Sequence, residues 1–226
     1  MTKAIIATTR PWNIEFFRGS LSNLSGDWRL LDSPEMLTDE LVACFKPEYI
    51  FFPHWSWRVP PSILNQTQCV CFHMTDVPYG RGGSPLQNLI VRGHTSTVIT
   101  ALKMVQEMDA GPVYLKRPLD LNGRAQEIYN RATRTILEMI DEIVRTRPAP
   151  VEQSGEVTLF ARRKPEESCL PQQASLNQIY DHIRMLDADT YPHAFLDWGE
   201  YRLEFRNAQP SDNGLSATVQ FIRKES

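Results

Sequence analysis

The chain has 226 residues, of which 42% are hydrophobic, and a formal net charge of −3 at pH 7. This length suits one α/β domain with an appendage or two small domains, and the apolar content is enough for a packed core. The small net charge, with no long run of one sign, argues against binding to nucleic acid or to an anionic membrane. No apolar stretch is long enough to span a bilayer, and the run Met1–Ile6 lacks the features of a signal peptide, so we expect a cytoplasmic protein.

Strand and helix signals alternate over residues 1–150, which we predict to form one α/β domain. Short, strongly apolar strand-like runs between helical patterns indicate a Rossmann-like, mostly parallel sheet with helices on both faces. In chain order we expect a strand at 4–7, a helix beginning near Pro11, a strand at 28–31, a helix over 34–45, strands at 49–52 and 69–72, a helix at 85–91, strands at 98–104 and 112–116, and a long amphipathic helix over 122–144.

Residues 151–226 are predicted to form a small C-terminal appendage. We expect a strand at 157–162, a polar connector, a helix opened by the capping-box pattern Ser175-Leu-Asn-Gln178, strands at 194–196, 201–205 and 217–222, and a loop over 209–214. Tyr191, Phe195, Trp198 and Tyr201 gather here. They suit stacking on a nucleotide base, contact with a second subunit in a homodimer, or packing in the core, and the sequence leaves these three alternatives open.

Several common classes of site are disfavoured by their missing motifs. The turn after the first strand, Thr8–Trp12, has no glycine, whereas a dinucleotide-binding fold carries G-x-G-x-x-G there. The glycine-rich segment Gly80–Gly83 lacks the Gly-Lys-Ser/Thr of a P-loop. Cys44, Cys69, Cys71 and Cys169 show neither zinc nor redox spacing, so we expect reduced thiols and no metal.

His73 and Asp109 are the strongest candidates for chemistry. His73 ends an apolar strand, at the mouth of a Gly/Pro-rich loop that runs to Pro85, and Asp109 lies in an Asp-x-Gly turn between two predicted strands. A base at a strand end with a carboxylate to orient it is a recurrent plan for acyl transfer. The plainer readings are a hydrogen-bonded core histidine and an ordinary turn aspartate.

The aromatic run Phe51–Trp57 marks the end of the third predicted strand. Such runs are most often part of the core. Pro53 and the polar residues between the rings favour a strand end, where Trp55 would line a pocket for a flat heterocycle.

The order of these segments resembles the N10-formyltetrahydrofolate-dependent formyltransferases, which include methionyl-tRNA formyltransferase and the sugar N-formyltransferases. The family pattern Asn-x-His-x-Ser-Leu-Leu-Pro, followed by a Gly-containing loop and an Asp-x-Gly turn, is similar to Cys71-x-His73-x-Thr75-Asp-Val-Pro78 and Asp109-Ala-Gly111 here. Further similar segments are 93–100, the connector 160–168, which resembles that of the sugar enzymes, and 183–195. The resemblance therefore covers nearly the whole chain.

The resemblance implies that an amine attacks the formyl carbon carried by the folate, with His73 as acid/base and Asp109 as its orienting partner. It places the pterin near His54, Trp55, Met104, Val105, Met108 and Asp109. It assigns Thr75, Asp76, Tyr79, Arg81 and Gly82 to the acceptor, which by the sugar-type connector is a nucleotide-linked amino sugar, of the type found in pseudaminic-acid-like pathways.

Two positions depart from the family pattern. Cys71 replaces the Asn whose amide donates to the oxyanion, and a thiol is a weak donor. Asp76 stands where the family usually has Leu, and an extra carboxylate there would recognise the acceptor's ammonium group. Two alternatives stay open: a binding module with impaired catalysis, and an acyl transferase or hydrolase with Cys71 as nucleophile. The chain is also shorter than the tRNA enzyme, which with its slightly acidic charge disfavours a tRNA acceptor.

Overall fold

The structure is a computed structural model that describes residues 1–224. The chain divides into two compact units, each assembled from segments that are separate in the sequence. The first unit contains residues 1–82, 97–119 and 130–159, and the second contains 83–96, 120–129 and the chain from residue 160 onward. The predicted division at residue 150 stays a prediction.

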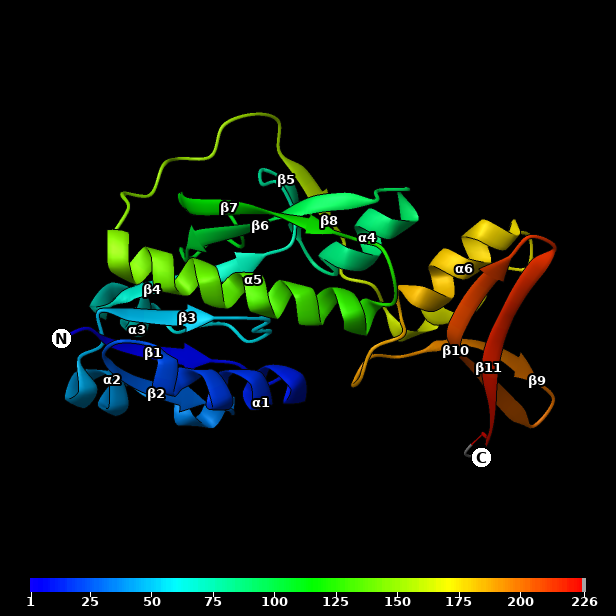
Figure 1. Cartoon of the computed structure of the whole chain (residues 1–226), viewed down its shortest axis with the longest axis horizontal. Coiled ribbons are helices and arrows are strands. Elements are labelled where there is room, and N and C mark those ends of the chain that lie inside the picture. Colours follow the sequence, from blue (N-terminus) through cyan, green and yellow to red (C-terminus); the bar gives the residue numbers. More distant parts are fainter. Residues whose placement is uncertain (225–226) are drawn as a thin grey trace. The chain divides into compact units, whose positions relative to one another are not determined.

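A six-stranded sheet forms the centre of the first unit (Figure 1). Its order is β2-β1-β3-β4-β6-β7, in which β1 pairs in parallel with β2 and β3, β3 pairs in parallel with β4, and β4 pairs antiparallel with β6. The strands are β1 (Lys3–Ala7), β2 (Asp27–Leu31), β3 (Tyr49–Phe52), β4 (Gln68–His73), β6 (Ser96–Lys103) and β7 (Val113–Asp120). The predicted mostly parallel sheet is confirmed.

Side-chain alternation along these strands supplies two apolar faces. Ile5, Ile50 and Phe52 pack in one cluster with Val42 of α2 (Asp39–Phe45) and Ile63 of α3 (Pro61–Gln66). On α1 (Pro11–Ser20), Asn13 accepts a buried hydrogen bond from Thr133 of the long helix α5 (Ala125–Thr146), which joins these two helices. The central β3 is buried at every residue. Helices therefore flank the sheet, as predicted.

Over residues 34–66 one local prediction was wrong and one helix was not predicted. The expected single helix at 34–45 is a 3₁₀ turn, η2 (Pro34–Met36), followed by α2. Thr38 interrupts it with extended backbone, and its side chain caps α2 by accepting a bond from the Leu41 N–H. The helix α3 was not expected, although Pro61 suits its first position.

Short elements connect and extend the main ones. Residues 79–82, expected as an irregular loop, form β5 (Tyr79–Gly82), which pairs with β8 (Thr158–Phe160). Gly80 and Gly82 have φ angles of 76° and 109°, a conformation that favours glycine. Two further 3₁₀ turns are η1 (Leu21–Asn23) and η3 (Pro165–Ser168).

The second unit contains a three-stranded antiparallel sheet of order β11-β10-β9. It is made by β9 (Ala194–Trp198), β10 (Tyr201–Ser211) and β11 (Gly214–Arg223), with the helices α4 (Pro85–Val91) and α6 (Leu176–Arg184). The predicted capping box is present, since Ser175 and Gln178 exchange hydrogen bonds. The predicted loop over 209–214 was wrong: β10 extends to Ser211 and only residues 212–213 make the turn.

None of the helices in residues 1–224 has both the length and the apolar character needed to cross a bilayer. The same residues contain no group of three or more His, Cys, Asp or Glu side chains placed to hold a metal ion.

Candidate functional site

His73 and Asp109 meet in the first unit. His73 is the last residue of β4, and Asp109 lies between β6 and β7. Because β6 runs antiparallel to β4, Lys103 at the end of β6 pairs with Val70 rather than with the end of β4. The segment 104–112 must therefore fold back toward His73, and it brings the Asp109 Oδ2 to 3.5 Å from the His73 Nδ1. His73 and Asp109 therefore lie together. The segment that folds back brings them together, rather than two adjacent parallel strand ends.

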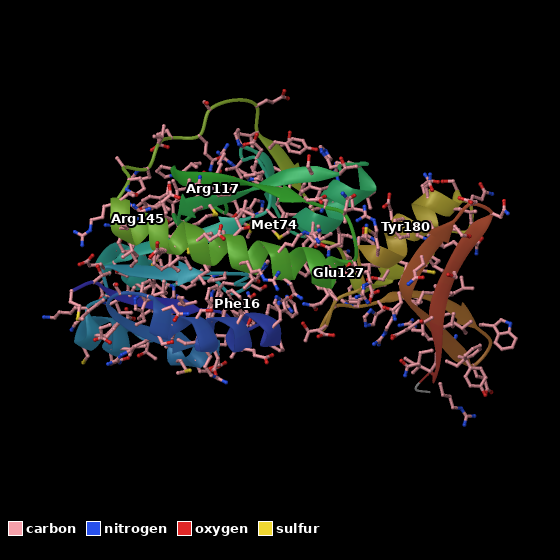
Figure 2. All side chains as sticks on the ribbon, in the orientation of Figure 1. Phe16, Met74, Arg117, Glu127, Arg145 and Tyr180 are labelled. Atoms are coloured by element: carbon pink, nitrogen blue, oxygen red, sulfur yellow. The ribbon has the colours of Figure 1, made fainter. Side chains whose placement is uncertain are left out.

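Each nitrogen of the His73 ring faces a polar atom of the chain. Its Nε2 lies 2.7 Å from the main-chain oxygen of Gly80, and the residue is 7% exposed. A carbonyl oxygen only accepts, so Nε2 carries a proton. The neutral ring then presents an unprotonated Nδ1 toward Asp109, and a hydrogen bond between this nitrogen and the carboxylate requires a proton on Nδ1 as well. The arrangement is a histidine–carboxylate pair, which is the geometry of a general acid/base site. Met74, which follows directly, is buried (Figure 2).

Asp109 is fixed by its own turn. Its Oδ2 accepts a hydrogen bond of 2.9 Å from the Gly82 N–H, and its φ of 53° is one that Asp tolerates better than most residues. A Cβ on Gly111 would lie 1.8 Å from the main-chain oxygen of Lys103, so this position requires glycine. The Asp-x-Gly pattern here reflects a close backbone approach rather than an ordinary turn.

Thr75 supports the loop carbonyl that orients His73. It is completely buried, and its Oγ1 lies 3.3 Å from the same Gly80 oxygen. Thr100 on β6 donates a 2.7 Å hydrogen bond to the Thr75 main-chain oxygen. Thr75 thus lies among the residues that hold the loop, whereas the family resemblance implies that it contacts the acceptor.

The other predicted acceptor residues have partners within the chain. Asp76 forms an ion pair with Lys116 at the surface, so an acceptor ammonium would compete with that lysine. Arg81 donates two hydrogen bonds to the Gln153 side chain and lies 3.6 Å from Glu107. Gln153 was not predicted as a site residue, because it lies outside every recognisable motif of the sequence. Tyr79 and Gly82 are half-buried in β5.

Two of the residues predicted to face the pterin pack on an apolar cluster. Trp55 and Met104 pack on the same cluster as Cys71. The buried indole N–H of Trp55 has no acceptor in the described part of the chain. Val105 and Met108, which follow Met104 in the chain, are 39% and 70% exposed. Aromatic and apolar side chains with a few polar groups are the usual lining of sites for flat heterocycles.

Burial shifts the pKa values of two groups, His54 and Cys71. Burial, with a smaller contribution from the charge of Arg10, lowers the pKa of His54 to about 4, so the ring is neutral at pH 7. Burial also raises the pKa of the Cys71 thiol far above its ordinary value, and the Asp109 carboxylate adds to the effect. A protonated thiol is a poor nucleophile, which counts against Cys71 as the attacking group.

Comparisons with known proteins find formyltransferases that are similar in sequence and in structure. A family model described as "Methionyl-tRNA formyltransferase, C-terminal domain" matches residues 165–222. A structure of methionyl-tRNA formyltransferase from Clostridium thermocellum is 46% identical, with a TM-score of 0.96 over 99% of this chain and 100% of that one. A sugar N-formyltransferase structure from Shewanella matches with a TM-score of 0.69 at 15% identity, over 92% of this chain and 97% of that one, which supports the fold alone.

Curated sequences agree at lower similarity. The methionyl-tRNA formyltransferase of Mesoplasma florum is 26% identical over 188 residues, which cover 79% of this chain and 59% of that protein. The chain spans about half to three-fifths of the length of the curated relatives that it matches.

Proposed function

Since this chain belongs to the formyltransferase family that includes methionyl-tRNA formyltransferase, we propose that it transfers a formyl group from N10-formyltetrahydrofolate to a primary amine. The family uses N10-formyltetrahydrofolate as its formyl donor. The observation that carries the proposal is the buried His73–Asp109 pair, with the Asp109 carboxylate fixed by the Gly82 N–H.

The pair supplies the proton acceptor that the reaction needs. An amine that attacks a formyl carbon must lose a proton, and general-base catalysis of such a step contributes about 10²–10⁴-fold. The side chain of Asp109 is 14% exposed and that of His73 only 8%, so the carboxylate is the member more open to an acceptor. We assign proton uptake to the pair as a unit, with the proton held between Nδ1 and Oδ2.

The donor side is assigned to the Trp55 cluster. The free indole N–H of Trp55 would donate to the pterin, and the exposed Val105 and Met108 would cover its face. His54, neutral at pH 7, would add no charge against it. Cys71 replaces the amide donor of the family pattern, so a main-chain N–H or water would stabilise the tetrahedral oxygen.

For the acceptor we propose a nucleotide-linked amino sugar. Residues 165–222, which match the C-terminal family model, contain nine carboxylates and three arginines, a formal charge of −6. RNA binding draws most of its affinity from basic side chains against phosphates, so this acidic segment favours a small acceptor. Four expectations from the sequence stay predictions: the identity of the sugar, its pseudaminic-acid type, the cytoplasmic location and the homodimer.

Methionyl-tRNA is the second candidate acceptor, because the 46% identical structure from Clostridium thermocellum carries that description. The test is a pair of assays with N10-formyltetrahydrofolate and purified protein. One assay offers nucleotide-linked 4-amino sugars and the other offers charged methionyl-tRNA, and mass spectrometry detects an added formyl group. Formylation of the tRNA alone would overturn the sugar acceptor, and no formylation in either assay would overturn the activity.

A further inference from the structure

Gln153 is joined to the catalytic turn through its amide. It lies in the segment 147–157 between α5 and β8, and its Oε1 accepts hydrogen bonds of 3.1 and 2.9 Å from the Nε and Nη2 of Arg81. Its Nε2 donates two bonds of 2.8 Å, to the main-chain oxygens of Asp109 and Gly111. One side chain thus bonds twice to the Asp-x-Gly turn and to the arginine of β5.

The chemistry of the neighbours fixes the orientation of this amide. Arginine only donates and main-chain carbonyls only accept, so the oxygen must face Arg81 and the nitrogen must face the turn. Both N–H groups and the carbonyl of Gln153 are used. Glutamate at this position would keep the acceptor for Arg81 and replace the two donors by an oxygen that repels both carbonyls.

The segment that carries Gln153 is itself anchored. Val151 and Val113 exchange main-chain hydrogen bonds of 2.7 and 2.9 Å, and the Thr158 N–H donates to the Pro78 oxygen at 3.2 Å. These bonds tie the segment to β7 on one side and to the start of the glycine-rich loop on the other. Gln153 therefore has a defined position, and its hydrogen bonds hold the turn in place.

The position of the turn affects the distance between Asp109 and His73. The Asp109 side chain has one bond to a main-chain group, from the Gly82 N–H, and its backbone lies in the left-handed region, where most residues are strained. Gln153 holds the backbone oxygen of that same residue. A shift of the turn would change the 3.5 Å separation of the Asp109 Oδ2 and the His73 Nδ1.

We propose that Gln153 is a positioning residue for the His73–Asp109 pair, acting through the backbone of the turn and with Arg81 as the brace on its other side. This inference rests on the proposed formyl transfer. It also assigns Arg81 to the support of the turn, in place of contact with the acceptor.

The test compares Gln153→Glu with Glu152→Gln, an exposed neighbour in the same segment, as the matched control. We expect kcat for formyl transfer to fall about ten-fold or more in Gln153→Glu, because a small misplacement of a reacting group costs up to about 10²-fold. The KM for each substrate should change less than about two-fold, and the control should match the wild type. Gln153→Ala, which removes the bonds without adding repulsion, should give a smaller loss of kcat.

A second readout does not depend on turnover. The ring ¹⁵N signals of His73 should shift in Gln153→Glu and stay in place in Glu152→Gln. If neither kcat nor these signals change in either Gln153 variant, the inference is wrong and Gln153 serves only the loop. If the wild type shows no formyl transfer, the proposed function fails, and the His73 signals alone decide whether Gln153 positions the pair.

Discussion

The surroundings of His73 and the three-stranded sheet β9–β11 differ in which side chains they bury and which they expose. Around His73 the polar groups are buried or partly buried and lie against polar partners: the His73 Nε2 and the Thr75 hydroxyl against the Gly80 oxygen, and the Asp109 carboxylate against the Gly82 N–H. In β9–β11 several large apolar side chains are exposed, including Trp198 at 63% and Phe221 at 59%.

The difference shows where each region gains its stability. Near His73, tight backbone turns and buried hydrogen bonds set the geometry, so small changes are costly. In β9–β11, Trp198 and Tyr201 pack edge-on against Phe221 at the surface, and ion pairs such as Arg202–Asp197 are solvent-exposed, which makes them weak. The surroundings of His73 depend on one geometry, whereas we expect the sheet β9–β11 to tolerate substitution.

The largest effect should follow from His73→Ala. Removing the ring takes away the proton acceptor of the pair, and we expect kcat/KM for formyl transfer to fall about 10³-fold, about 4 kcal/mol of barrier. The measurement is steady-state kinetics with N10-formyltetrahydrofolate and the acceptor that the paired assays identify. Activity within about three-fold of the wild type would remove His73 from the chemistry.

Gly111→Ala should be the most damaging single methyl group for folding. The added Cβ would meet the Lys103 oxygen at 1.8 Å, and we expect a loss of at least about 3 kcal/mol in unfolding free energy. Urea unfolding measures it. Gly19→Ala in α1 is the control: its Cβ would meet nothing within 4 Å, so stability should rise by up to about 1 kcal/mol. Equal effects of the two changes would contradict the close approach at Gly111.

His54→Asn tests the neutral buried histidine. The folded pKa of about 4 lies below the ordinary 6.5, so the unfolded chain binds a proton that the folded chain excludes. The wild type should therefore lose stability as pH falls from 6.5 to about 4, by at most about 3 kcal/mol from this group. Asn has no such proton and tolerates the φ of 50° at this position. Unfolding free energies at pH 7 and pH 4.5 should differ less in the variant than in the wild type.

Cys71→Asn distinguishes an oxyanion site from a nucleophile. Asn restores the amide donor of the family pattern, so we expect kcat to stay within about three-fold of the wild type or to rise. Cys71→Ser serves as the companion, since it keeps the size and weakens a nucleophile. Loss of turnover in both variants would instead support Cys71 as the attacking group.

The smallest effect should come from Phe221→Ser in β11. Its ring is already 59% exposed, so the unfolding free energy should change by less than about 1 kcal/mol, and kcat should be unchanged. Phe195→Ser in β9, where the ring is 8% exposed, is the buried counterpart and should cost about 3 kcal/mol. A large cost at Phe221 would show that this face is covered in solution.

Much of the fold could be read from local patterns. The runs at 4–7, 49–52 and 69–72 are apolar at nearly every position, as strands buried on both faces must be. The missed pieces were of another kind. Glycines at 80 and 82 read as a loop, yet β5 forms because β8 pairs with it from far along the chain. The Thr38 cap splits a helix that the apolar spacing alone predicts as continuous.

The sequence by itself determined the sheet, the candidate pair His73 and Asp109, and the resemblance to the formyltransferases, because these depend on residue types at short, ordered spacings. Only the tertiary structure decided that β6 runs antiparallel to β4, that Thr75 and Arg81 brace the loops, and that Gln153 holds the Asp109 turn. Such contacts join residues that are far apart in the chain. No local spacing encodes them, since a hydrogen bond depends on where two backbones meet after the core has packed.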